Sequence, residues 1–211
     1  MTPIETNYEH LASSVIANLK KRNMEGYYCH NKIEAFEQII SLIPEQSTVG
    51  FGGSMTVKEL GLLTALENGN FNLIDRRNAT SPRESREFHA KTMLADYYLM
   101  SSNAITYDGE LINIDGLGNR VSCLAFGPET VIIVAGMNKL VPDVASGIAR
   151  VHNVAAPPNG VRLNTSTPCA VTGLCGSCLG DHTMCCQTVV TRNSREKGRI
   201  KVFLIGETLG Y

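Results

Sequence analysis

The sequence has no excess of charge of either sign and no long apolar run. Its 211 residues carry 19 Lys plus Arg against 20 Asp plus Glu, so it lacks the basic footprint typical of nucleic-acid-binding proteins. No stretch approaches the roughly 20 apolar residues that a membrane span needs. The N-terminus holds Glu5, Glu9 and a basic cluster at 20–22 without a continuous apolar run, unlike a secretory signal. We therefore expect a cytoplasmic protein with no nucleic-acid partner and no membrane association.

The chain also lacks internal repeats and low-complexity segments, and its hydrophobic content of 43% can fill one ordinary core. We expect one domain over residues 1–211. Period-2 patterns and β-branched runs predict strands at 27–29, 48–51, 71–75, 97–101, 105–107, 111–114, 130–135, 188–191 and 200–205. Helical spacing predicts helices at 6–22, 33–43, 56–67 and 142–151, and one that begins at Ser81-Pro82.

Repeated strand–helix units predict an α/β fold with a mostly parallel, Rossmann-like sheet and helices on both of its faces. Asp108-Gly109 lies between two strand patterns and predicts an inserted antiparallel hairpin. The segment from Pro157 to Gly160 is expected to end the helical pattern before a Cys-rich C-terminal segment. Ligands of such sheets bind at the carboxyl ends of the strands, so the loops there are the first place to look for a site.

Five of the seven cysteines lie between Cys169 and Cys186. An odd number of cysteines without an export signal argues against a disulfide framework. Cys169, Cys175, Cys178 and Cys185 have the spacing C-x5-C-x2-C-x6-C. Four thiolates at such short separations suit a metal centre. A compact run favours a 4Fe-4S iron–sulfur cluster over zinc, which is more often held by two separated pairs, while free thiols or a redox pair stay open.

Two further residues of this segment are alternatives to the four cysteines. Cys186 directly follows Cys185, and adjacent cysteines do not easily point into one site, so Cys186 is either an alternate ligand or a spare thiol. His182 could replace a thiolate, although a lone histidine in a loop is usually solvated.

A glycine-rich loop runs from Gly50 to Thr56 between a predicted strand and a predicted helix. Free backbone N–H groups at such a place favour an anion, and we expect Gly52, Gly53, Ser54 and Thr56 to bind one. The loop has no Gly-Lys-Ser/Thr, and Met55 replaces the last glycine of a dinucleotide fingerprint, so nucleotide binding does not follow. The alternative is a tight turn with Ser54 or Thr56 as the helix N-cap.

Polar residues surround the predicted hairpin, where turn chemistry alone explains Asp, Asn and Gly. Asp108 and Asp115 are candidates for a general base. Lys139 follows the buried strand and stands where it could meet an anion, and Arg77 could do so after the strand that ends at Asp75. The charged run made of Arg76, Arg77 and the charged residues at 83–89 is interpreted as a mostly solvated face.

Three segments, GFGGSMTVKELG, ITYDGELINIDGLGNRVSCLAFGPETVIIVAGMNKLVPD and PCAVTGLCGSC, resemble the LUD-domain family of lactate utilisation proteins over most of the chain. The resemblance implies a fold similar to the NagB/RpiA/CoA-transferase superfamily. It also implies a cleft flanked by the glycine loop at Gly52–Thr56 and by the segment from Asp108 to Asn119, Asn113 included, with Lys139 nearby. Members are implicated in lactate oxidation together with iron–sulfur partner subunits.

The leading hypothesis is an accessory or electron-transfer subunit that takes part in oxidation of lactate or a related organic acid and carries the iron–sulfur cluster. Its partners would be a small anionic organic acid and iron–sulfur subunits, with a homodimer as the default expectation. One alternative is a sugar-phosphate or acyl-CoA-type enzyme that uses Asp108 or Asp115 as the base. Another is a ligand-sensing module in which zinc has a structural role.

Overall fold

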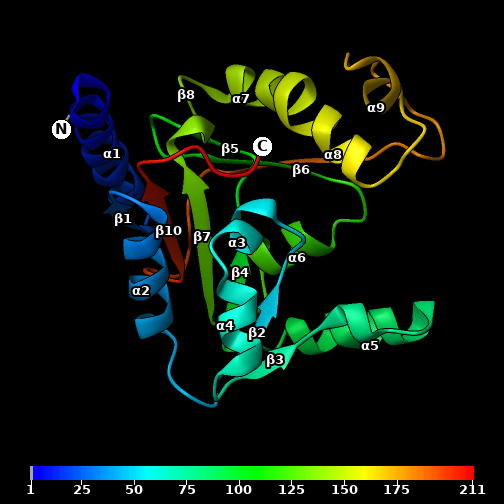
Figure 1. The fold of residues 1–211 in the computed structure, drawn as a ribbon, viewed down its shortest axis with the longest axis horizontal. Coiled ribbons are helices and arrows are strands. Elements are labelled where there is room, and N and C mark those ends of the chain that lie inside the picture. The colour runs from blue at the N-terminus through cyan, green and yellow to red at the C-terminus, as the bar shows by residue number, and fades with distance from the viewer. Residues whose placement is uncertain (1) are drawn as a thin grey trace.

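The computed structural model describes residues 2–211, which form two β-sheets surrounded by helices (Figure 1). The larger sheet has six strands, all parallel. Their order across the sheet is β1 (Glu25–Cys29), β10 (Ile200–Ile205), β7 (Thr130–Gly136), β4 (Tyr97–Met100), β2 (Thr48–Phe51) and β3 (Asn72–Ile74). The predicted α/β class with a mostly parallel sheet is confirmed.

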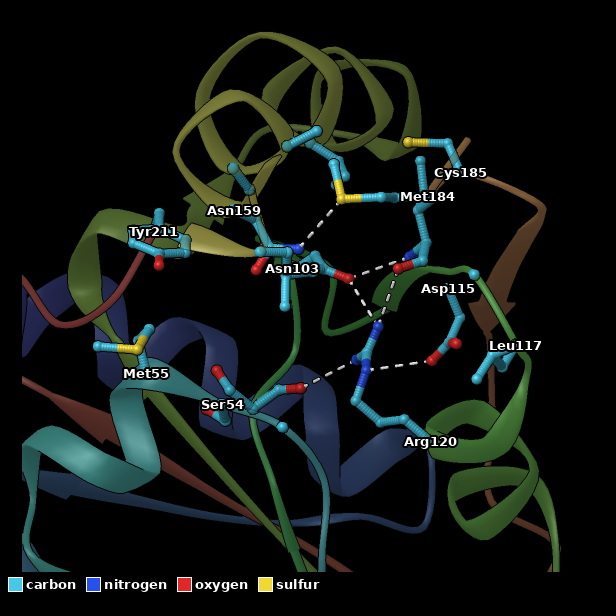
Figure 2. A pocket seen from close by; sticks show the side chains of 18 of the residues that line it. Ser54, Met55, Asn103, Asp115, Leu117, Arg120, Asn159, Met184, Cys185 and Tyr211 are labelled. Atoms are coloured by element: carbon cyan, nitrogen blue, oxygen red, sulfur yellow. Dashed lines mark hydrogen bonds and ion pairs between the residues drawn. The ribbon is translucent and has the colours of Figure 1, made fainter. Parts of the chain in front are cut away.

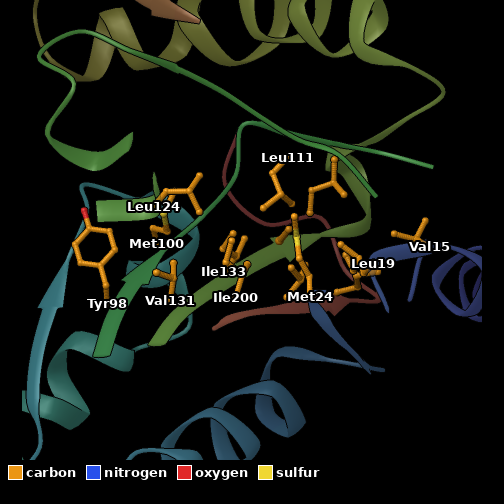
Figure 3. Close-up of a cluster of buried hydrophobic side chains, with 14 of the residues drawn as sticks. Val15, Leu19, Met24, Tyr98, Met100, Leu111, Leu124, Val131, Ile133 and Ile200 are labelled. Carbon is orange, nitrogen blue, oxygen red and sulfur yellow. The ribbon is translucent and has the colours of Figure 1, made fainter. Parts of the chain in front are cut away.

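Helices cover both faces of this sheet, as predicted. Against one face, side chains of α1 (Pro3–Lys21) and α6 (Asn119–Ala125) pack on alternate residues of β7, such as Val131 and Ile133 (Figure 3). Against the other face, α2 (Lys32–Leu42), α3 (Met55–Glu59) and α4 (Leu62–Asn68) pack on Ile132 and Val134. The strand is continuously apolar because both of its faces are covered.

The helix predicted at 56–67 is in fact two helices. Gly61 ends α3 and begins α4 with φ of 75°, a left-handed conformation that favours glycine. Both helices still bury their apolar residues, for example Val57 and Leu66, in the same core. The apolar spacing survives the break, which is why periodicity alone did not reveal it.

The smaller sheet has four strands and lies beyond the carboxyl ends of the larger sheet (Figure 1). It consists of β8 (Leu140–Val141), β5 (Ala104–Thr106), β6 (Leu111–Asp115) and β9 (Gln187–Thr191). The predicted hairpin is confirmed, since Ala104 pairs with Ile112 in an antiparallel register. The two-residue strand β8 was not predicted because it is too short to show a period.

The segment from Pro157 to Gly160 does not end the helical pattern, and that prediction was wrong. Helix α7 (Val144–Arg150) continues through a π-helical turn (Val151–Ala155) into α8 (Ala156–Arg162). Pro157 and Pro158 lie in the first turn of α8, directly after the π-helical turn. The wide π turn shifts the hydrogen bonds, so that the prolines are accommodated.

The remaining helical segments are short or lie at the edge of the fold. Ser81 caps α5 (Pro82–Thr92) as predicted, because its hydroxyl accepts from the Glu84 N–H. The others are the 3-10 turns η1 (Arg76–Asn78) and η2 (Met137–Lys139) and the helix α9 (Pro168–Thr172). None of the helices within residues 2–211 is long and apolar enough to span a membrane.

Candidate functional site

A cleft of about 600 Å³ opens between the carboxyl ends of the large sheet and the structures above them. Its floor is made by the loops that follow β2, β3, β4 and β7, which meet because parallel strands end at one edge. Its opposite wall is made by the helical segment α7–α8 and by the cysteine-containing segment around Cys185 (Figure 2). The glycine loop and part of the cysteine cluster, which lie far apart in the sequence, therefore share one cavity.

The glycine loop contributes Gly53, Ser54, Met55 and Thr56 to the cleft. Ser54 is also the N-cap of α3, since its hydroxyl accepts from the Val57 N–H at 3.3 Å. The alternative of a turn capped by Ser54 is thus confirmed, while anion binding by the loop stays a prediction. Gly52 lies behind the wall instead: a Cβ there would come within 2.9 Å of the Tyr98 hydroxyl and 3.1 Å of Arg120.

Lys139 lies at the floor of the cleft with only 3% of its surface exposed. Its Nζ donates to Thr56 Oγ1 at 2.9 Å and to Ser101 Oγ at 3.0 Å. Within residues 2–211 no Asp or Glu forms an ion pair with it. Burial, together with the positive charges of Arg150 and Arg120, lowers the pKa of Lys139 to about 7, against a smaller opposing effect of Glu59.

Arg120 is the other buried cation of the cleft, and it is fully engaged by the protein. Its Nε faces Asp115 Oδ2 at 3.3 Å, and both side chains are at most 12% exposed. Its remaining N–H groups donate to four neutral oxygens: Ser101 O, Asn113 Oδ1, Asn103 Oδ1 and Ile114 O. A guanidinium has five N–H donors, and all five have partners here. Arg120 therefore organises the loops of the cleft (Figure 2) and has no donor left for a ligand.

The two hairpin carboxylates lie in different places. Asp115 lines the cleft, paired with Arg120, and also accepts the Gly118 N–H at 2.9 Å. Asp108 is exposed in the hairpin turn, where its backbone oxygen accepts from Arg22 of the C-cap of α1, and it does not line the cleft. Of the two candidate bases, Asp115 alone lies in the cleft. Its carboxylate already forms an ion pair with Arg120.

The two asparagines of the 113–119 segment also differ. Asn119, at the first position of α6, lines the cleft. Asn113 is completely buried beneath it, where its amide donates to Ser102 Oγ at 3.2 Å and its oxygen accepts from Arg120. Asn113 acts on the cleft only through Arg120.

Arg77 does not line the cleft, whereas its neighbour Arg76 does. Arg77 turns toward Asp75 and Glu67 and lies over the Phe51 ring, 5.2 Å from its centroid. Both arginines lie in the 3-10 turn η1, and consecutive residues of such a turn point in different directions. Arg76 has no ion-pair partner within residues 2–211, and the prediction that it lies on a solvated face was wrong, since it lines the cleft.

The five C-terminal cysteines belong to the segment that contributes to the cleft wall. Cys169 is buried in α9, Cys175, Cys178 and Cys185 are partly buried, and Cys186 is exposed. Burial, together with the nearby thiols of Cys169, Cys175, Cys178 and Cys186, raises the pKa of Cys185 to about 11. Cys185 and Cys186 line the cleft directly, whereas His182 is exposed and does not.

The donor set of this segment fits a metal that prefers sulfur. Four other thiols lie near Cys185, and the sulfur of Cys178 contacts the Thr183 hydroxyl at 3.5 Å. As the side chains stand, no three His, Cys, Asp or Glu residues of 2–211 converge closely enough to hold a metal ion. An iron–sulfur cluster or a zinc ion would have to draw the thiols of the exposed 173–186 loop together around Cys169.

Fold and site together define an α/β protein with a cationic cleft at the carboxyl ends of its parallel sheet and a cysteine cluster at the rim. The chain belongs to the LUD domain family, whose match covers residues 12–205. This confirms the family that the sequence resembles, and with it a lactate-utilisation-like protein. No curated protein matches the chain.

Among solved structures, a DUF162 family protein from Deinococcus radiodurans is similar at 13% identity and a TM-score of 0.56, over 94% of this chain and 98% of that one. At this identity the likeness shows the fold. Ribose 5-phosphate isomerase A from Neisseria gonorrhoeae is similar over 54% of each chain, at 15% identity and a TM-score of 0.35. That likeness spans about half of either protein.

Proposed function

We propose that this protein binds the anion of lactate or a related small organic acid in the cleft and serves as an accessory or electron-transfer subunit in the oxidation of that acid. In this proposal Cys169, Cys175, Cys178 and Cys185 hold a 4Fe-4S cluster beside the cleft. One observation carries it: a single cavity has unpaired cations at its floor and cysteines at its rim.

Charge supports the choice of an anionic ligand. In the described part of the chain, protonated Lys139, Arg76 and Arg162 line the cleft without an acidic partner. Asp115 is neutralised by Arg120, and Asp181 is the remaining acidic residue of the lining, so the lining has a net positive charge. Unpaired cations inside a partly enclosed cavity attract an anion more strongly than exposed charges would, because water screens them less. A carboxylate between Lys139 and Arg76 would give both cations a counter-ion.

The position of the cysteines supports a redox role. An iron–sulfur cluster accepts and donates single electrons. Helix α9 holds Cys169 in a buried position, and on metal binding the 173–186 loop would bring Cys175, Cys178 and Cys185 toward it. Cys185 belongs both to this group and to the wall of the cleft, so a ligand in the cleft lies close to the metal-binding segment.

The first experiment tests the metal. Protein purified without oxygen is expected to contain about four iron atoms and labile sulfide per chain and to absorb in the visible range, as a 4Fe-4S cluster does. Cys169→Ser and Cys178→Ser should abolish this content. Cys29→Ser and Cys123→Ser are matched controls, since both cysteines are buried in the core away from the cleft and should not affect iron. Stoichiometric zinc, or no metal, would overturn the electron-transfer role.

The second experiment tests the anion. Calorimetric titration with L-lactate and with pyruvate should show binding, and Arg76→Gln should weaken it about tenfold, as expected for loss of one charge-assisted contact of about 1.4 kcal/mol. Arg83→Gln is the control, because Arg83 is exposed and pairs with Glu87 on its own helix. Absence of binding of any small organic acid to metal-loaded protein would overturn this part of the proposal.

A further inference from the structure

The arrangement around Lys139 points to a covalent chemistry that anion binding does not require. We propose that Lys139 is a nucleophilic amine that forms an imine with the carbonyl carbon of a 2-oxo acid bound in the cleft. The inference rests on the proposed anion-binding function and adds a reacting residue and a ligand class to it.

The hydrogen bonds around Lys139 leave the lone pair of a neutral Nζ free to attack a carbonyl carbon. The Thr56 hydroxyl donates to the backbone oxygen of Leu209 at 3.3 Å, and the Ser101 hydroxyl donates to that of Ser102 at 3.2 Å. Both hydroxyl protons are thus used, so both oxygens act as acceptors toward Nζ, at 2.9 and 3.0 Å. A neutral amine has two N–H groups and one lone pair. These two acceptors satisfy the N–H groups and leave the lone pair without a partner.

The charges around Lys139 favour this neutral form. Arg120 from α6 and Arg150 from α7 are positive and face it, and Glu59 from α3 is the negative group in its surroundings. Glu59 accepts the Gly210 N–H at 2.8 Å, and no ion pair joins it to Lys139 in residues 2–211. Burial and the two arginines lower the pKa of Lys139 to about 7, so a large fraction of the free amine exists at neutral pH.

The reaction balances without an oxidant or a reductant. The lone pair of Nζ adds to the C2 carbonyl carbon, and the resulting carbinolamine loses its oxygen as water, which carries away both amine protons. A C=N bond replaces the C=O bond. Arg76 lies in the same cleft and is available for the carboxylate of the acid. In its protonated, iminium form the imine acidifies the hydrogens on C3, so that water can remove them, and pyruvate bound in this way should exchange its methyl hydrogens with solvent.

Reductive trapping tests the imine on the whole protein. Pyruvate and cyanoborohydride at pH 7.5 should attach the reduced pyruvate group to Lys139 at least tenfold faster than to Lys58, an exposed lysine on α3 that serves as the internal control. The rate at Lys139 should level off above about pH 8, whereas an ordinary lysine titrates near pH 10.4. Lys139→Arg, which keeps the charge, should lose both this adduct and the exchange of the pyruvate methyl hydrogens in D2O.

Ligand-observed NMR with pyruvate separates the possible failures. Binding of pyruvate without preferential labelling of Lys139 in the wild-type protein would overturn the imine and leave the anion-binding proposal standing. Absence of pyruvate binding would overturn both. The comparison of Lys139 with Lys58 is made within one wild-type sample, so it does not depend on the folding of a variant.

Discussion

The ion pair between Asp115 and Arg120 makes a quantitative prediction about stability. Asp115→Asn keeps the size of the side chain and its acceptor for the Gly118 N–H, but removes the negative charge that faces Arg120 Nε at 3.3 Å. The asparagine amide then either turns its own N–H groups toward the guanidinium or gives up the Gly118 contact. Breaking a buried ion pair by removing one partner costs about 3–5 kcal/mol.

The structure places the expected loss at the lower end of that range, at about 3 kcal/mol, because Arg120 keeps four hydrogen bonds to neutral oxygens. For a chain of this length that corresponds to a fall in melting temperature of about 6–12 °C. Urea and thermal unfolding followed by circular dichroism measure both quantities. A loss of less than about 1 kcal/mol in the free energy of unfolding would show that the Asp115 carboxylate does not stabilise the charge of Arg120.

Two further variants locate the effect in this pair. Asp108→Asn is the control, because Asp108 is exposed in the hairpin turn, and it should change stability by less than about 0.5 kcal/mol. The double variant Asp115→Asn with Arg120→Met should be more stable than the sum of the single losses by about 1 kcal/mol or more, as expected for residues in direct contact. Strict additivity would refute the coupling.

Two remaining predictions concern Lys139 and the glycine loop. Because the pKa of Lys139 falls from 10.5 to about 7 on folding, the unfolded chain binds more protons between these values, so this residue should make stability rise as pH increases from about 7 to 10. Lys139→Met should reduce that rise in urea unfolding at stepped pH, and an unchanged slope would refute the shift. Gly52→Ala should cost about 1–3 kcal/mol because its Cβ would press on Tyr98 and Arg120. Gly53→Ala should be nearly neutral, since it meets only the end of Arg76 at 3.3 Å, and equal losses at the two glycines would contradict the geometry.

The fold was predictable because its strongest signals are local. The run Thr130 to Ala135 is continuously apolar and β-branched, and it became the central strand β7. The Asp108-Gly109 turn fixed the hairpin, and Ser81-Pro82 fixed the start of α5. Breaks that preserve the apolar period, such as Gly61 and the π turn before Pro157, left no comparable signal.

The candidate site was only half predictable, because its members meet through topology. Lys139, Ser54 and Thr56 were found from their places after strands, and parallel pairing brought them together. Arg120 appeared in sequence as one of several polar residues after a turn, and nothing local indicated that five acceptors surround it. Arg76 was missed in favour of Arg77, since a 3-10 turn decides which of two adjacent arginines faces the cleft.

Binding of a carboxylate in this cleft should be coupled to the protonation of Lys139, and the charges around Lys139 determine whether a proton is taken up or released. A carboxylate placed near Lys139 favours the charged amine and so raises its pKa, against the effect of Arg150 and Arg120 and in the same direction as Glu59. Binding of lactate near pH 7 should therefore take up part of a proton, and affinity should fall as pH rises through about 7 to 8. Calorimetry in two buffers of different ionisation enthalpy measures the proton uptake directly. Lys139→Met should abolish the uptake, and proton release on binding in the wild-type protein would refute the placement of the carboxylate beside Lys139.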